Sequence, residues 1–522
     1  MRTTACPPSP TTVCLLACAL VLTFATSLSA QQPLGIALDG AAAGDRAGFS
    51  VAVSGDGARV AVGAMLNDDG GEDGGHVRVF GRGGTDGWTS VGLAVEGSGV
   101  GDNLGQAVAL SGDGEVLAAG VPYADIGGGD AGLVRVLGYD EVAEEWRPRG
   151  QDILGEAPGD LSGAAVSLSS DGDRVAVGAY RANLTPRASG QVRVYDFDAA
   201  TETWVQLGED IDGGAAFGQL GWSVSLSGGG TRVAVGAPFS NVAGPTSGQV
   251  TVYDYDEAAG AWRQVGAPIN GAAAGDVSGW SVALSRDGSH VAVGAPYSDR
   301  GGVDAGEVRV YAYDDAAGIW QMRGMPLVGR SAGDLVGASV ALSAKGERVV
   351  FGAVGQDNGG DAAGQACLYD WDAGAAAWRQ AGLDVDGGAA ADQFGTAVSL
   401  SDDGESVIVG APFGDANGAD AGQARVYGID PIGEATVSNT TEVSGPVLSV
   451  GPNPAREFVA VSGVAVDDAL ELTLYDGAGR EVARGERGGD RLSLPTATSG
   501  VHTLVVRYTG GVAHRRIVLA GQ

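Results

Sequence analysis

The chain has 522 residues, 44% of them hydrophobic, so it is long enough for several domains and can bury a large core. The formal net charge of −33 repels nucleic acids and anionic membranes and excludes them as electrostatic partners. The 91 glycines follow no G-X-Y period, which excludes a collagen-like chain.

Residues 1–30 are predicted to be a secretory signal peptide. Arg2 precedes an apolar run, Val13–Thr23, that is too short to span a bilayer, and small residues at Ser27–Ala30 offer a cleavage region. A lipoprotein signal with Cys18 as the acylated residue is the alternative. No other segment is long and apolar enough for a transmembrane helix, so the protein is expected to be secreted or held at the outer cell surface.

Residues 31–430 contain one stretch repeated seven times. Its clearest copy runs from Gly275 to Trp320. A glycine opens the first strand-like run of each copy, with a spacing of 57 residues once and 58 residues five times: Gly48, Gly105, Gly163, Gly221, Gly279, Gly337 and Gly395. A period this long and regular indicates a repeat architecture.

Each repeat is predicted to contain four strands. In the fifth repeat, Ser281–Ser285 and His290–Ala295 flank a tight turn, Glu307–Tyr313 alternates in polarity, and Trp320 begins the outer strand. Residues 33–40 look like a lone strand whose pattern recurs after each of the first six repeats and is missing after the seventh. The sequence therefore predicts an all-β fold, a seven-bladed β-propeller whose N-terminal strand completes the last blade.

The loops of such a blade alternate between the two faces of the ring. The loop between the second and third strands shares one face, here called the upper face, with the loop that joins one blade to the next. The lower face carries only short hairpins.

The repeats resemble FG-GAP repeats, the units of the integrin α-chain propeller. The resemblance covers Leu34 to Asp430 and depends on the G-x-S-V strand and on a V-G-A-P motif, as in Val293-Gly294-Ala295-Pro296. The family places calcium-binding D-x-D-x-D-G loops between the first two strands. Here that connection is only S-x-D-G, as in Ser285–Gly288, and one carboxylate does not supply the six to eight oxygens that calcium needs.

Two series of Asp and Asn recur on the upper face. Their expected role is to hydrogen-bond nearby backbone and fix the loops, and calcium bridging is the alternative. The loop 67–73 is the richest in acids, and Asn67, Asp69 and Asp73 are its candidate metal ligands, with Ca²⁺ as the candidate cofactor. The first series precedes the first strands and the second lies in the long loops: Asp45, Asp102, Asp160, Asp276, Asp334 and Asp392; Asn67, Asp125, Asn183, Asn241, Asp299, Asp357 and Asp415.

Aromatic residues break the sevenfold repetition near the central opening. Trp222 and Trp280 each follow a repeat glycine in adjacent blades, and Phe239 and Tyr297 lie in nearby loops. Clustered aromatic side chains stack on sugar rings or anchor protein partners, so these four are the candidate ligand-binding residues. Ordinary packing at the loop roots is the alternative.

No catalytic constellation is visible in the sequence. His76 and His290 occupy strand positions that other repeats fill with other residues, and they are predicted to be solvated. A Ser-His-Asp or metal-histidine site would need them to converge with partners. The chain is therefore predicted not to be an enzyme.

Residues 431–446 are predicted to be a linker, and residues 447–522 a small β-sandwich. The tail resembles the type A sorting domain of the type IX secretion system, with one departure, His502, where tyrosine is usual. The resemblance implies a Bacteroidota-type cell, export by the type IX secretion machinery and removal of the tail. The residues that carry it are Pro452, Asn453, Pro454, Asp476, Gly479 and Gly500.

Together these features favour a non-catalytic binding or adhesion propeller that presents its upper face to an extracellular protein or polysaccharide. A propeller-based enzyme acting on polysaccharides and a structural surface protein without a discrete ligand are the alternatives.

Overall fold

We describe the chain from a computed structural model. It describes residues 31–83, 87–182, 187–382 and 384–430, together with the strands of the C-terminal segment. The chain divides between Glu434 and Ala435 into two compact units. The predicted signal peptide and linker lie outside the described residues.

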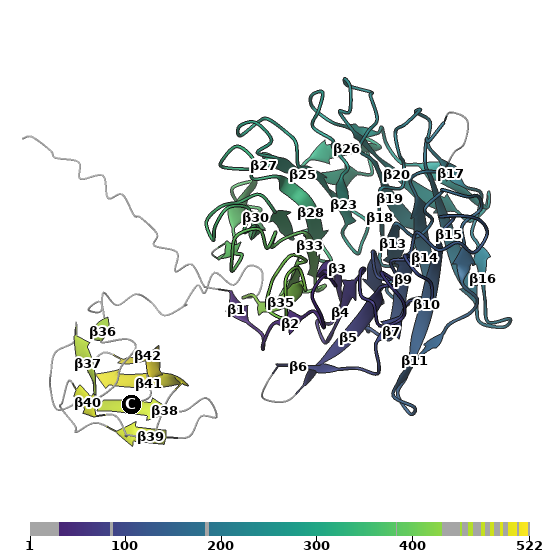
Figure 1. Cartoon of the computed structure of the whole chain (residues 1–522). Helices are drawn as coiled ribbons and strands as arrows, with labels where there is room; N and C mark the ends of the chain where they lie inside the picture. Colours follow the sequence, from purple (N-terminus) through teal and green to yellow (C-terminus); the bar gives the residue numbers. More distant parts are fainter. Residues whose placement is uncertain are drawn as a thin grey trace, which may run out of the picture. The chain divides into compact units, whose positions relative to one another are not determined.

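The first unit is a ring of seven five-stranded sheets, the blades (Figure 1). The first, innermost strands of blades 1 to 7 are β3 (Ala47–Val53), β8 (Val108–Leu110), β13 (Ala165–Leu168), β18 (Ser223–Leu226), β23 (Ser281–Leu284), β28 (Val336–Leu342) and β33 (Ala397–Leu400). The second strands are β4 (Arg59–Ala64), β9 (Val116–Val121), β14 (Arg174–Ala179), β19 (Arg232–Ala237), β24 (His290–Ala295), β29 (Arg348–Ala353) and β34 (Ser406–Ala411). The third strands are β5 (His76–Gly83), β10 (Leu133–Asp140), β15 (Gln191–Asp198), β20 (Gln249–Asp256), β25 (Glu307–Asp314), β30 (Gln365–Asp372) and β35 (Gln423–Gly428).

The outer strand of each blade is broken into two short pieces that both pair with the third strand. In blades 1 to 6 these pieces are β6 (Gly87–Ser90) and β7 (Val95–Glu96), β11 (Glu145–Pro148) and β12 (Ile153–Leu154), β16 (Thr203–Gln206) and β17 (Ile211–Asp212), β21 (Ala261–Gln264) and β22 (Ile269–Asn270), β26 (Ile319–Met322) and β27 (Leu327–Val328), and β31 (Ala377–Gln380) and β32 (Val385–Asp386).

The N-terminal segment completes blade 7. Strands β1 (Gln32–Pro33) and β2 (Leu38–Asp39) pair antiparallel with β35, with Gln32 opposite Gly428 and Leu38 opposite Ala424. The predicted all-β, seven-bladed fold is thereby confirmed, and the ring is closed by strands from opposite ends of the unit.

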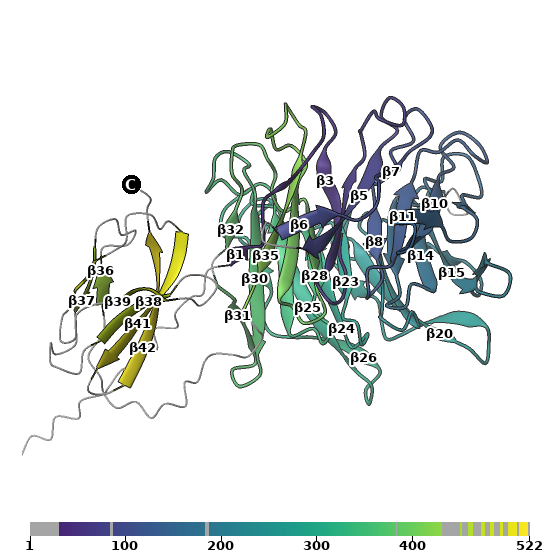
Figure 2. The same ribbon diagram turned by 90° about the horizontal axis from the view of Figure 1, so that it is seen from below.

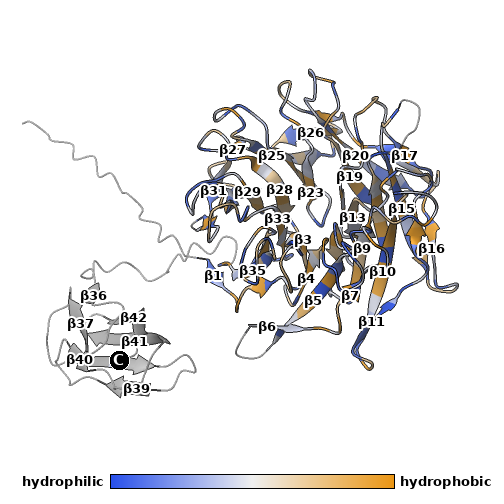
Figure 3. Ribbon diagram, in the orientation of Figure 1, coloured by the Kyte–Doolittle hydropathy of each residue, from blue (hydrophilic) through white to orange (hydrophobic). Residues whose placement is uncertain are grey.

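The hydrophobic core lies between neighbouring blades. The second strands are buried along almost their whole length, because both faces of a middle strand are covered. Figure 3 shows the apolar residues along strands such as β4 and β9. One cluster joins blade 7 to blade 1, since Ala424 and Val426 pack with Val60 and Val62.

The glycine of the V-G-A motif lets each blade approach the next. A Cβ placed on Gly410 would lie 1.9 Å from the backbone oxygen of Gly48, across the closing interface. A Cβ placed on the same glycine of the other six blades would lie 1.9–2.2 Å from the backbone oxygen of the repeat glycine in the following blade. The motif is therefore a packing requirement of the ring rather than a turn signal.

The two faces of the ring carry different connections (Figure 2). On the lower face the hairpins between first and second strands are joined from blade to blade by backbone hydrogen bonds. Gly112 N donates to Ser170 O at 2.7 Å, and the circle closes where Asp402 N donates to Gly55 O at 2.9 Å. These bonds fix the lower rim as a continuous circle.

The second unit contains two sheets among its described strands. The first has the order β36-β37-β40 and the second the order β39-β38-β41-β42. Of the residues that carry the sorting-domain resemblance, Gly500 begins β41, and Pro452, Asn453, Pro454, Asp476 and Gly479 lie outside the described residues. The strands are β36 (Ser449–Gly451), β37 (Phe458–Ser462), β38 (Glu471–Tyr475), β39 (Glu481–Arg484), β40 (Arg491–Ser493), β41 (Gly500–Tyr508) and β42 (Gly511–Leu519).

Candidate functional site

A cavity of about 400 Å³ opens at the centre of the upper face. All seven residues that follow the repeat glycines line it, because each lies within two residues of the start of an innermost strand. Three further lining residues come from the upper-face loops, which agrees with the predicted sidedness. The lining consists of Phe49, Gln106, Ala164, Trp222, Trp280, Ala338 and Thr396, and of Tyr180, Val354 and Gln393.

The four predicted ligand-binding aromatic residues form one cluster. The Trp222 and Trp280 rings lie 4.7 Å apart, centroid to centroid. Phe239 meets Trp222 edge-on at 5.6 Å, and Tyr297 meets Trp280 at 6.1 Å. Trp222 and Trp280 line the cavity, whereas Phe239 and Tyr297 support them from the adjoining loops.

Sequence reasoning missed Tyr180. Its ring packs on Trp222 at 4.8 Å and extends the aromatic wall into blade 3, and burial raises the pKa of its phenol. Tyr180 occupies the position that proline holds in the V-G-A-P motif. This departure from the motif is the sequence feature that could have pointed to Tyr180 as a cavity residue. Apart from Phe49 and Val354, the rest of the cavity wall is small or polar.

One side chain spans the lower end of the central opening. The Arg286 guanidinium, from the lower hairpin of blade 5, donates to the Ser170 hydroxyl of blade 3 and pairs with the Asp402 carboxylate of blade 7. Burial raises the pKa of Asp402, and the charge of Arg286 opposes that shift. The ion pair ties three blades together beneath the aromatic cavity.

The acid series that precedes the first strands fixes loops, as expected. Asp45 is buried and accepts hydrogen bonds from the backbone N–H groups of Ala41 and Ala42. Asp276 and Asp392 accept the equivalent bonds from Ala273 and Ala389. These carboxylates satisfy backbone donors of the turn, and calcium bridging stays a prediction.

The second series was misaligned in blade 1. In the other loops, the side chain of this series accepts a hydrogen bond from the backbone N–H five residues later, as in Asp125, Asn241, Asp299, Asp357 and Asp415. In blade 1 the equivalent acceptor is Asp68, which bonds Asp73 N, and not Asn67. Asn183 lies outside the described residues. Asn67 instead donates from its amide to Asp45 and accepts from Asp69 N, which leaves it within the loop scaffold.

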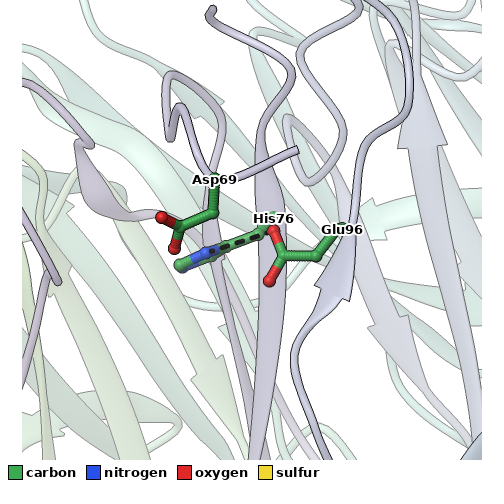
Figure 4. A group of neighbouring side chains, drawn as sticks. All are labelled: Asp69, His76 and Glu96. Atoms are coloured by element: carbon green, nitrogen blue, oxygen red, sulfur yellow. Dashed lines mark ion pairs between the residues drawn. The ribbon is translucent and has the colours of Figure 1, made fainter. Parts of the chain in front are cut away.

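Of the three predicted metal ligands, Asp69 joins a different group. Its carboxylate lies with His76 and Glu96, and one ligand atom of each falls within 4.8 Å of the others (Figure 4). Asp73 is not in this group. The prediction that His76 is solvated was wrong, since His76 is 2% exposed, and His290 is half-buried.

The group formed by Asp69, His76 and Glu96 has more negative than positive charge. Burial and, to a smaller extent, Arg78 lower the pKa of His76 to about 4, so its ring is neutral near pH 7. Burial and the charge of Asp69 raise the pKa of Glu96. Two carboxylates and a neutral imidazole thus face one another.

Within the described part of the chain, no helix has both the length and the apolar character needed to cross a bilayer.

Comparisons with known proteins agree with the repeat architecture. A family model described as FG-GAP repeat matches residues 269–311 and 378–427, and each match runs from the outer strand of one blade to the third strand of the next. No curated protein matches the chain.

Similar solved structures include a periplasmic gluconolactonase from Pseudomonas aeruginosa and the hydrazine synthase of Kuenenia stuttgartiensis. The first is 18% identical, covers 65% of this chain and 85% of its own, and has a TM-score of 0.46. The second is 15% identical, covers 72% and 93%, and has a TM-score of 0.45. On the evidence of the motif match and the blade topology, this chain carries FG-GAP repeats that build a seven-bladed β-propeller.

Proposed function

We propose that the propeller is a non-catalytic extracellular binding module whose central cavity takes part of a polysaccharide. The supporting observation is the convergence of Trp222, Trp280 and Tyr180 on one cavity that Gln106 and Thr396 also line. Sugar rings combine apolar C–H faces with hydroxyl groups. Aromatic faces stack on the former and amide or hydroxyl side chains hydrogen-bond the latter.

The size of the cavity sets the extent of the ligand. A volume of about 400 Å³ is at the lower end of the range for small-molecule sites. One or two sugar units fit such a volume, so the proposal is recognition of a chain end or a side branch. In this proposal the acidic surface of the chain favours neutral or cationic glycans.

The test is binding of the full chain to a glycan array, followed by calorimetry with the best hit. The double variant Trp222→Ala plus Trp280→Ala is expected to lose binding. Phe217→Ala is the matched control, because this exposed aromatic side chain lies on an inter-blade loop outside the cavity lining. Glycan binding that survives in the double variant removes the proposal, and capture of a protein but no glycan replaces it with a protein-binding function.

We further propose that the chain is exported by its signal peptide and then by type IX secretion. The support is the sequence resemblance of residues 447–522 to type A sorting domains. Expression in a host with and without that secretion system, followed by surface labelling and mass spectrometry of the termini, tests it. Equal surface labelling in both hosts contradicts the proposal.

A further inference from the structure

We propose that Asp69, His76 and Glu96 form a binding site for a divalent transition-metal ion of the zinc class at the upper rim of blade 1. The site is separate from the central cavity. It uses the final residue of one short strand, the first residue of another and a residue of the loop above them (Figure 4).

The backbone brings two of the ligands together. His76 begins β5 and stands directly opposite Glu96 of β7 in the antiparallel pairing. The His76 Nδ1 and the Glu96 carboxylate are 3.9 Å apart. Asp69 reaches the same place from the loop between β4 and β5, where the contact between Asp69 N and Asn67 Oδ1 fixes its backbone.

The buried histidine is the observation that points to a ligand. His76 is 2% exposed, and neither ring nitrogen has a hydrogen-bond partner among the residues that the structure describes. A buried polar group without a partner costs free energy, and native proteins rarely keep one without a reason. A metal ion coordinated by one nitrogen would supply the missing interaction.

The other blades show what these three positions do without a metal. In blade 6 they are Asn358, Gln365 and Asp386. The Gln365 amide donates to Asp386 at 2.6 Å, and the Asn358 amide donates to the same carboxylate at 3.4 Å. Each side chain of that triad therefore has a partner within the blade.

Blade 1 replaces both amides of that triad with metal-ligand side chains. Asp69 and His76 stand at the positions of Asn358 and Gln365, and Glu96 stands at the position of Asp386. Two amide groups are lost and two metal-ligand groups are gained at converging positions. In blade 5 the positions of Asp69 and His76 hold Arg300 and Glu307. These two side chains also meet, as an ion pair of 3.0 Å.

The donor set selects the class of metal. Imidazole nitrogen together with carboxylate oxygen suits Zn²⁺ and its first-row neighbours, whereas Ca²⁺ takes oxygen ligands. Tetrahedral ligands of Zn²⁺ are about 3.4 Å apart, so atoms already within 4.8 Å need only small rotations. Asp69 and Glu96 are exposed, the Asp69 carboxylate accepts a long hydrogen bond of 3.5 Å from the Asn67 amide, and the fourth position is left to water.

Neighbouring charge favours a cation. Besides Asp69 and Glu96, the buried Asp45 lies close enough to act on His76, and Arg78 is the opposing positive group. Three carboxylates thus outweigh one guanidinium around the imidazole. The Arg78 guanidinium is itself held by the backbone oxygen of Asp39.

The test is calorimetry of the chelator-treated full chain, without a histidine tag, against ZnCl₂ in the presence of millimolar CaCl₂. One Zn²⁺ per chain is expected. His76→Gln removes a ligand outright, so it is expected to weaken that binding at least about 100-fold, the upper end of the loss caused by changing a residue that only supports a ligand. Because glutamine at this position is hydrogen-bonded in blades 3 and 6, the variant is expected to keep the melting temperature of the metal-free protein.

A matched pair of variants separates the site from the acidic surface. Glu96→Gln is expected to weaken Zn²⁺ binding, and Asp386→Asn, the equivalent change in blade 6, is expected to leave it unchanged. Zn²⁺ should raise the melting temperature of the unaltered chain but not that of His76→Gln. Binding that is unaffected by His76→Gln, or that Ca²⁺ abolishes, overturns the proposal.

Discussion

The indole Nε1 of Trp88, in blade 1, donates a hydrogen bond of 2.7 Å to the backbone oxygen of Leu34, which lies between the two strands that close blade 7. The same bond joins each of blades 2 to 6 to the blade before it, as from Trp146 to Val91 and from Trp378 to Arg323. The outer-strand tryptophans therefore bind blades to one another. At the closing interface this bond joins blade 1 to blade 7, and the strands of blade 7 come from the two ends of the unit.

Replacing Trp88 by phenylalanine keeps an aromatic ring but removes the donor. We expect Trp88→Phe to lower the free energy of unfolding by about 1 kcal/mol, the usual net value of one hydrogen bond. Denaturant titration followed by circular dichroism measures it. Trp378→Phe, which removes the equivalent bond between blades 5 and 6, is the control and should give a similar loss. An unchanged midpoint for Trp88→Phe contradicts the role of the bond in closure.

The approach of Gly410 to Gly48 predicts a larger effect. A methyl group at Gly410 would meet backbone at 1.9 Å, and backbone cannot rotate away as a side chain can. Gly410→Ala is expected to cost more than about 2 kcal/mol of stability through overpacking. In Gly138→Ala, the control, the added methyl group meets nothing within 4 Å, so the change should stay within about 0.5 kcal/mol. Equal stability of the two variants would falsify the close-approach explanation.

Filling the central cavity is expected to block the proposed ligand without removing the aromatic cluster. Ala338 lines the cavity beside Trp280, in the adjoining blade. In Ala338→Trp the new side chain should occupy much of the space, and affinity for the glycan hit should fall at least about tenfold, or 1.4 kcal/mol. Calorimetry checks the affinity and thermal melting checks the fold. Full affinity in a folded Ala338→Trp protein would place the ligand elsewhere.

The stability of the propeller should depend on His290 at mildly acidic pH. Burial first, and then the charge of Arg323, lowers the pKa of His290 to about 4, while Asp287 acts in the opposite direction. Between pH 6.5 and 4 the unfolded chain takes up a proton that the folded chain does not, so stability falls as pH falls through this window. Above pH 6.5 the ring is neutral in both states and contributes nothing to the pH dependence.

The variant His290→Gln isolates this contribution from the many carboxylates. Between pH 6.5 and 5 the melting temperature of the unaltered chain should fall more steeply than that of the variant. Parallel curves over that interval would mean that the His290 ring is protonated as readily in the folded protein as in the unfolded chain.

Much of the ring was predictable because its signals are local. Alternating polarity marks the strands, and the regular spacing of the glycines gives the number of blades. The missing outer strand after Asp430 and the spare one at residues 33–40 predict the closure that β1 and β2 make with β35. The central convergence of Trp222 and Trp280 was also predictable, since the residue after the repeat glycine lines the central cavity in every blade.

The tertiary structure alone decided which side chains outside that axis meet. Arg286 reaches Ser170 and Asp402 across 116 residues of chain in each direction, a contact that depends on the curvature of the closed ring. His76 looked like a solvated strand residue, because strand periodicity does not tell how a neighbouring loop covers a position. Its burial, and its meeting with Asp69 and Glu96, arise from the register of β5 with β7 and from the path of the loop above them.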